Sequence, residues 1–157
     1  MHASRPPPPV IAGLYVLEYA TADRSVRYEQ RRTLNVGGKW LGRVPCLALC
    51  QPFNDSGFMI QHCSSKWESL GVAAGYKTAR DAKLSLERSY RGITSMWRKQ
   101  KVTKRRAHTA YKRQLRAESC SFCGRTPLEV QSMAGMNVRI CNICVERLYQ
   151  AMHPQGA

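Results

Sequence analysis

The sequence predicts an α+β protein built from two modules. In the N-terminal module a small antiparallel sheet is covered by one helix, and a basic segment joins it to a C-terminal module with paired cysteines. Three observations predict this arrangement. Short apolar runs extend from residue 10 to 63, apolar residues then recur at helical spacing after Lys77, and two Cys-x-x-Cys pairs lie in the last forty residues.

The chain begins with a Pro-rich arm, residues 1–9. It contains four consecutive prolines, Pro6 to Pro9, and lacks the apolar periodicity of a helix or a strand. We therefore expect the arm to be disordered.

Strand-like runs follow the arm. Residues 14–19 form the first, residues 33–36 a weaker one, and residues 41–51 and 57–63 two longer ones. The last two are joined by Asn54-Asp55-Ser56-Gly57, which has the composition of a hairpin turn. These runs predict an antiparallel sheet.

One helix is predicted after Lys77. Thr78 can cap its first turn with Asp81 three residues on, Gly92 can stop it, and Lys83 and Glu87 are spaced to pair on its outer face. A single apolar stripe follows the 3.6-residue period. The stripe consists of Ala79, Ala82, Leu86, Tyr90 and Ile93. Sheet and helix together predict an α+β domain over residues 10–97.

The composition changes at residue 98. Residues 98–116 hold nine positive charges and no acidic residue. This pattern predicts a basic linker or a solvated helix over residues 98–117, and it is a candidate nucleic-acid contact. The nine cationic residues are Arg98, Lys99, Lys101, Lys104, Arg105, Arg106, Lys112, Arg113 and Arg116.

Length and composition exclude several classes. The chain has 157 residues with a formal net charge of +15, and 43% hydrophobic residues suffice for a core. It holds neither an apolar run long enough to span a membrane nor a Gly-x-x-x-x-Gly-Lys-Ser/Thr phosphate loop. An odd number of cysteines, seven, argues against a fully paired secreted scaffold and favours a cytoplasmic protein. Three of them, Cys46, Cys50 and Cys63, lie in the strand-like runs, and we expect them to be buried and inert.

The C-terminal module, residues 118–157, carries the most specific pattern. Cys120 and Cys123 form one Cys-x-x-Cys pair, Cys141 and Cys144 form another, and seventeen residues separate the pairs. This spacing is typical of one zinc ion held by four thiolates, which leave no open position for a substrate. Gly124 suits the turn that follows the first pair. The second pair opens a helix, so we expect a treble-clef finger with one structural Zn²⁺.

The same residues resemble a known family. Cys120-Ser-Phe-Cys-Gly-Arg125 and Ile140-Cys-Asn-Ile-Cys-Val-Glu146 are similar to the two ends of the zinc-binding domain of ClpX chaperones. The resemblance covers about residues 118–152. It implies a treble clef that dimerises and binds adaptors or unfolded proteins, with Cys120, Cys123, Cys141 and Cys144 as its ligands.

These observations favour a non-enzymatic, bacterial zinc protein whose finger binds a protein partner or a second copy, with no membrane and no small-molecule substrate. The interaction surface is predicted from an apolar stripe on the last helix. The stripe consists of Val145, Leu148, Tyr149 and Met152.

Two alternatives remain open. One is a nucleic-acid-binding regulator, whose contacts would belong to the basic segment because residues 118–157 carry three basic and three acidic groups. The other is an immunity protein of a bacterial toxin system, which the segment from Trp67 to Trp97 faintly resembles.

Overall fold

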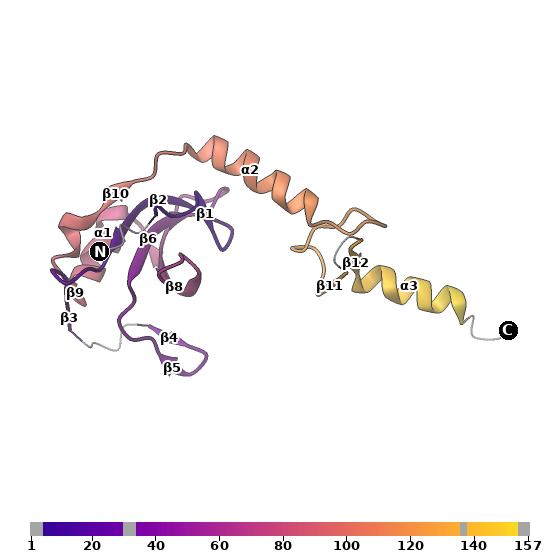
Figure 1. Cartoon of the computed structure of the whole chain (residues 1–157), viewed down its shortest axis with the longest axis horizontal. Coiled ribbons are helices and arrows are strands. Elements are labelled where there is room, and N and C mark those ends of the chain that lie inside the picture. The colour runs from indigo at the N-terminus through magenta and orange to yellow at the C-terminus, as the bar shows by residue number, and fades with distance from the viewer. Residues whose placement is uncertain (1–4, 30–33, 136–137, 154–157) are drawn as a thin grey trace. The chain divides into compact units, whose positions relative to one another are not determined.

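The computed structural model describes residues 5–29, 34–135 and 138–153. It divides the chain into two compact units, Met1–His108 and Thr109–Ala157. The mixed helical and antiparallel composition confirms the predicted α+β class. Figure 1 labels the elements of both units.

A six-stranded antiparallel sheet forms the framework of the first unit. Its order is β1-β2-β6-β7-β8, and β10 also pairs with β2, beyond β1 along the same edge of that strand. The bounds are β1 Val10–Ile11, β2 Leu14–Thr21, β6 Cys46–Gln51, β7 Phe58–Cys63, β8 Ser69–Tyr76 and β10 Arg98–Lys99. The turn predicted at residues 54–57 joins β6 to β7, and β6 begins at Cys46 rather than at residue 41.

Two smaller ladders accompany the sheet. β3 (Arg27–Tyr28) pairs with β9 (Tyr90–Arg91), and β4 (Asn35–Val36) pairs with β5 (Lys39–Trp40). The β4–β5 turn uses Gly37 and Gly38, both with positive φ, as a tight hairpin requires. The hairpin lies close to β8, because a Cβ added at Gly71 would approach Val36 Cγ2 to 2.7 Å.

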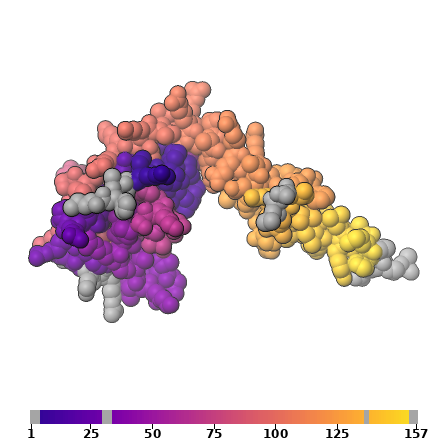
Figure 2. Space-filling model, in the orientation of Figure 1, coloured from indigo at the N-terminus to yellow at the C-terminus, as the bar shows by residue number. Residues whose placement is uncertain are grey.

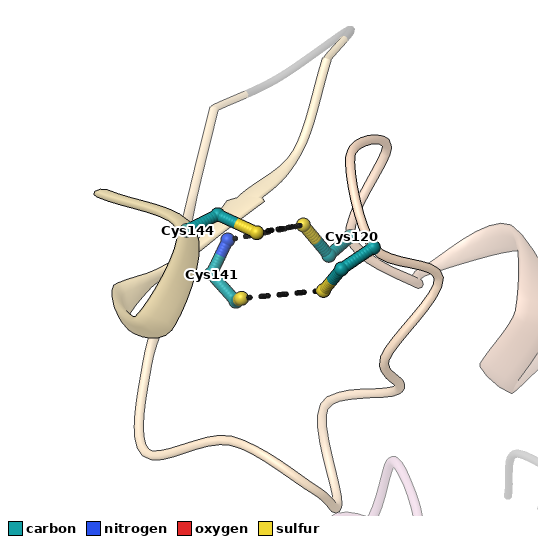
Figure 3. A group of neighbouring side chains, drawn as sticks. Cys120, Cys141 and Cys144 are labelled. Carbon is teal, nitrogen blue, oxygen red and sulfur yellow. Dashed lines mark hydrogen bonds between the residues drawn. The ribbon is translucent and has the colours of Figure 1, made fainter. Parts of the chain in front are cut away.

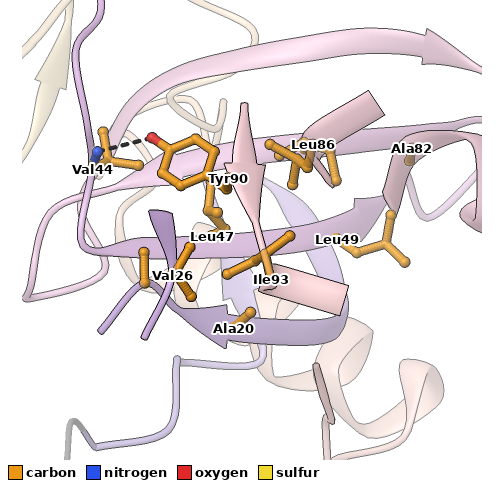
Figure 4. Close-up of a cluster of buried hydrophobic side chains, with 11 residues drawn as sticks. Ala20, Val26, Val44, Leu47, Leu49, Ala82, Leu86, Tyr90 and Ile93 are labelled. Atoms are coloured by element: carbon orange, nitrogen blue, oxygen red, sulfur yellow. Dashed lines mark hydrogen bonds between the residues drawn. The ribbon is translucent and has the colours of Figure 1, made fainter. Parts of the chain in front are cut away.

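Helix α1 (Ala79–Glu87) covers one face of the sheet. Thr78 Oγ1 accepts a hydrogen bond from the Asp81 N–H at 3.0 Å, which confirms the predicted cap. Ala82 and Leu86 pack onto the side chains of β6 and β7 that point to this face, including Leu47, Leu49 and Ile60 (Figure 4). These residues form the main core.

The predicted helix is too long, and its outer ion pair is wrong. Tyr90 belongs to β9, and Ile93 begins the 3₁₀ turn Ile93–Met96, so the apolar stripe continues through three different elements. The Glu87 carboxylate instead accepts hydrogen bonds from the N–H groups of Gly92 and Thr94. Lys83 pairs with Glu18 on β2. Lys83 therefore pairs with a residue distant in sequence and not with Glu87 on its own helix.

The opposite face of the sheet carries a second cluster. Cys46, Cys50 and Cys63 are buried there with Val16 and Trp67. Burial raises the pKa of the Cys63 thiol to about 12 and keeps it protonated, which supports the expectation that these cysteines are inert.

The Pro-rich arm packs against this second face. From Arg5 onward it differs from the prediction of disorder: Pro7 is buried, and the Trp67 indole N–H donates to the Arg5 carbonyl at 2.8 Å. Residues 1–4 lie outside the described residues. The sequence pattern does not reveal this packing, because the partners lie far along the chain.

The basic segment is structured. β10 takes up its first two residues, and helix α2 spans Lys104–Ala117, so the division between the two units falls within α2. In the described part of the chain, no helix has the length and apolar composition needed to cross a bilayer.

The second unit contains a short hairpin and a helix. β11 (Met133–Ala134) pairs with β12 (Ile140–Cys141), and α3 (Asn142–Met152) follows at once. Its buried cluster consists of Cys120, Cys141 and Cys144, with four partly buried hydrophobic residues against them. An apolar core of this size cannot hold a domain together without a further cross-link.

Candidate zinc centre

A tight turn at residues 120–125 presents the first two thiols. The Gly124 N–H donates to the Cys120 carbonyl at 2.8 Å, and the Cys120 N–H donates to the Arg125 carbonyl at 2.8 Å. Gly124 has φ +72°, in the left-handed region that disfavours a side chain. The chain therefore folds back on itself and points Cys120 and Cys123 at one place, as the glycine predicts.

The hairpin and the last helix present the other two thiols. Cys141 ends β12 and is the N-cap residue of α3, and Cys144 lies in the first turn of that helix. The turn is tied to the hairpin through Ser121, whose N–H donates to the Arg139 carbonyl at 2.8 Å and whose hydroxyl accepts from the Arg139 N–H at 3.1 Å. A turn, a hairpin and a helix arranged in this way form a treble clef.

The four cysteine side chains are close enough together to hold one metal ion. Their Sγ atoms all lie within 4.8 Å of one another. The Sγ atoms of Cys120 and Cys144 are 3.8 Å apart, and those of Cys123 and Cys141 are 3.7 Å apart (Figure 3). Zinc–sulfur bonds of about 2.3 Å in tetrahedral geometry require sulfur–sulfur distances of about 3.8 Å. The spacing therefore fits Zn²⁺.

The surroundings favour the thiolate at Cys120 and Cys123, whereas side-chain hydrogen bonding with Cys123 and burial raise the pKa of Cys144 to about 12. Burial alone would raise the pKa of Cys120, but the backbone N–H groups of Cys123, Cys141 and Phe122 lower it to about 6. The Arg125 side chain lies against Cys123, and its own pKa is raised by that contact. Four thiolates and one Zn²⁺ carry a net charge of −2, which the Arg125 guanidinium partly offsets. Arg125 is a residue of this site that cysteine spacing alone does not reveal.

The site is structural in its chemistry. Cys120, Cys141 and Cys144 are buried, whereas Cys123 is exposed. Four protein thiolates complete the tetrahedron and leave no coordination position for a water molecule or a substrate. The fold and the site together define a C-terminal four-cysteine zinc module that binds one zinc ion.

The zinc module is similar to a known family. A family described as the ClpX C4-type zinc finger matches residues 118–153, which confirms the resemblance seen in the sequence. No curated protein and no solved structure is significantly similar to the chain.

The predicted interaction stripe lies on the surface of α3. Its four residues have exposed fractions between 44% and 69%, whereas Cys144 on the same helix is buried at the metal site. Other exposed apolar residues of this unit were not anticipated, because they belong to no periodic pattern. They are Phe122, Leu128 and Val138.

The nine predicted cationic residues are divided between the units. In the first unit Lys104 is partly buried and its Nζ donates to Gln51 Oε1 at 3.0 Å, while Arg98, Lys99, Lys101, Arg105 and Arg106 are exposed. In the second unit Lys112, Arg113 and Arg116 are exposed on α2.

Proposed function

We propose that the protein is a non-enzymatic, cytoplasmic zinc protein whose finger mediates protein–protein interaction. One observation carries the proposal: the helix that supplies Cys144 to the metal presents an uncovered apolar face to solvent. Tyr149 is 61% exposed and Met152 is 69% exposed, fractions that isolated domains usually avoid for adjacent large apolar side chains.

The face is held in a fixed position. Val145, Leu148, Tyr149 and Met152 lie on one side of α3, and the cysteine ligands fix its first turn. Beside Val145 and Tyr149 a shallow groove runs to Met133 and Ile140 on the hairpin. Figure 2 shows α3 at the surface of its unit, in yellow. A rigid helix face next to a groove suits binding of an apolar partner helix or extended segment.

Two kinds of partner fit this surface. Zinc fingers of the ClpX type are generally protein-interaction modules, so a second copy of the chain and an unfolded or adaptor protein are both candidates. Both are expected to bury the same stripe.

The test compares two single variants of α3. Leu148→Asp places a charge within the stripe, and Gln150→Asp places one at an exposed polar position of the same helix. Sedimentation measures self-association, and co-sedimentation with reduced, carboxymethylated α-lactalbumin measures binding of an unfolded chain. We expect Leu148→Asp to lose at least one of these activities by tenfold or more and Gln150→Asp to keep both. Zinc-loaded protein that shows neither activity would contradict the proposal.

Nucleic-acid contact is a second candidate. It is supported by the eight exposed cations of residues 98–116, which have no acidic residue among them. Reversing Lys101 and Arg106 to glutamate should remove a salt-sensitive complex with a 30-base DNA duplex. The matched control reverses Arg80 and Arg88, which are also exposed in the first unit. Equal binding by both double variants would dismiss this candidate.

A further inference from the structure

The second face of the sheet in the first unit holds the Pro-rich arm through three hydrogen bonds. The Trp67 Nε1–H donates to the Arg5 carbonyl at 2.8 Å, the Gln100 Nε2–H donates to the Pro7 carbonyl at 3.3 Å, and the Val16 N–H donates to the Pro9 carbonyl at 3.0 Å. Alternate carbonyls of the arm, at residues 5, 7 and 9, therefore each accept one hydrogen bond.

The arm has the chemistry of a polyproline II ligand. Its peptide bonds are trans, and successive prolines restrict both their own φ and the preceding residue to extended, polyproline II backbone. Such a segment has carbonyl acceptors but no N–H donors at its prolines. The three groups that hold it are all donors, so they complement a backbone that supplies carbonyl acceptors at its prolines.

Aromatic side chains lie at the surface that binds the arm. Trp67 is 6% exposed and packs edge-on against Tyr19, with ring centroids 5.6 Å apart. Pro7 is buried, while Pro6 and Pro8 on either side of it are exposed. A buried proline, together with an indole N–H that binds the carbonyl two residues before it, is a pattern typical of aromatic surfaces that recognise proline-rich peptides.

Trp67 is also strained. Its φ is +66°, a conformation that is rare for a bulky side chain. The surrounding loop holds it there: the Trp67 N–H donates to the Ser64 carbonyl, and Ser64 Oγ accepts from the N–H groups of Lys66 and Glu68. A glycine would fit this backbone without strain, so the tryptophan is retained at a cost at the point of contact with the arm.

We propose that the arm-binding surface, made of Val16, Trp67 and Gln100, is a receptor for proline-rich segments, and that residues 5–9 are its intramolecular ligand. A proline-rich segment of a partner protein displaces the arm and takes over its hydrogen bonds. The site lies within the first unit and is independent of the zinc finger, so it adds a second interaction surface to the proposed function.

Because the arm is tethered, it competes at an effective concentration of about millimolar. The first step of the test is therefore a variant that weakens binding of the arm. Pro7→Asp places a charge at the buried position and should release the arm in the full-length, zinc-loaded protein. The Trp67 indole N–H resonance then reports whether the arm-binding surface is occupied. It should move away from its position in the unsubstituted protein. Pro8→Asp, at the neighbouring exposed position, is the matched control and should leave the resonance in place.

The probe is the peptide Arg-Pro-Pro-Pro-Pro-Val-Ile, which repeats residues 5–11. Adding it to the Pro7→Asp protein should return the indole resonance to its original position in a saturable way. A peptide with alanine in place of the four prolines should bind at least tenfold more weakly. Gln100→Ala in the same background should weaken the proline peptide roughly 2- to 12-fold, the loss expected for one hydrogen bond.

Three results from the Pro7→Asp protein would overturn the proposal. They are an indole resonance that Pro7→Asp does not move, equal binding of the proline and alanine peptides, and a Pro7→Asp protein that remains folded but ignores the peptide at millimolar concentration. A dimer of the unsubstituted protein that exchanges arms while failing to bind the peptide would also overturn it, in favour of a second copy as the occupant. Zinc content is measured throughout and should stay unchanged.

Discussion

The hydroxyl of Tyr90 accepts a hydrogen bond from the backbone N–H of Val44 at 2.9 Å, inside the main core (Figure 4). Tyr90 is 1% exposed and Val44 is 2% exposed. The bond satisfies an N–H at the approach to β6 that lies outside any strand ladder. Burial raises the pKa of Tyr90, so the hydroxyl stays neutral. Tyr90, which the sequence predicts as part of the helical stripe, thus holds the loop before β6 in place.

Tyr90→Phe should therefore destabilise the first unit. The ring is kept, but the buried Val44 N–H loses its acceptor, at a cost of about 1–3 kcal/mol in the free energy of unfolding. Urea unfolding followed by tryptophan fluorescence measures the loss, because Trp40, Trp67 and Trp97 all belong to this unit. Tyr76→Phe is the control. Its hydroxyl donates to the partly buried Ser85 Oγ at 3.2 Å and to no backbone group among the described residues, so its effect should be smaller.

Cys141→Ser should abolish zinc binding. Cys141 ends the hairpin and begins α3, so its loss removes a ligand and detaches both elements from the metal. Since zinc supplies most of the folding free energy of such modules, α3 should lose its helicity. Native mass spectrometry should find one zinc ion in the unsubstituted protein and none in the variant. Cys46→Ala, at a buried cysteine of the first unit, should retain the metal, and retention by both variants would contradict the assignment.

Gly135→Ala should weaken the finger without touching a ligand. Gly135 has φ +102°, and a Cβ placed there would lie 2.0 Å from the Val138 carbonyl oxygen. The hairpin must distort, and we expect a loss of more than about 1 kcal/mol. Competition with a chromogenic chelator measures the drop in zinc affinity. Gly42→Ala, where nothing lies within 4 Å of the added Cβ, should change nothing.

The free energy of unfolding of the first unit should depend on pH through the protonation of His62. This side chain is 4% exposed, and its Nδ1 has no hydrogen-bond partner within the described part of the chain. Burial lowers the pKa of His62 to about 4, although the backbone carbonyl of Ile60, as an acceptor for the ring, opposes the shift. The folded state thus favours the neutral ring. The stabilisation is complete above the unfolded pKa of about 6.5 and is lost as the pH falls from there toward 4.

Denaturation at a series of pH values checks this dependence. The unsubstituted protein should lose roughly 3 kcal/mol between pH 6.5 and 4, and His62→Leu should show a flatter profile over that interval. Tryptophan fluorescence is the required readout, because acid also releases zinc from the other unit. Parallel pH profiles for the two proteins would show that another group is responsible.

The zinc centre could be predicted from the sequence because its determinants are local. Two Cys-x-x-Cys pairs, a glycine after the first and a helix at the second suffice to place four sulfur atoms around one ion. The sheet could be predicted only in part. Strand β8, with the sequence Ser-Leu-Gly-Val-Ala-Ala-Gly-Tyr, has a single β-branched residue, Val72, and contains two glycines, so propensity does not mark it.

The other differences arise from partners distant in sequence. Glu18 draws Lys83 away from Glu87, and β3 draws Tyr90 out of the helix. Trp67 and Gln100 hold an arm whose own residues give no sign of order. Local pattern cannot anticipate such pairings, because each depends on the finished sheet.

The seven cysteines fall into two chemically separate populations. Cys46, Cys50 and Cys63 are sealed in the first unit as protonated thiols, whereas Cys123 leaves the metal site open to solvent on one side. A thiol-directed electrophile applied together with a chelator would consequently label the C-terminal unit alone. A dye or cross-linker can thus be attached selectively to the finger for binding measurements. The N-terminal unit stays native and serves as an internal reference.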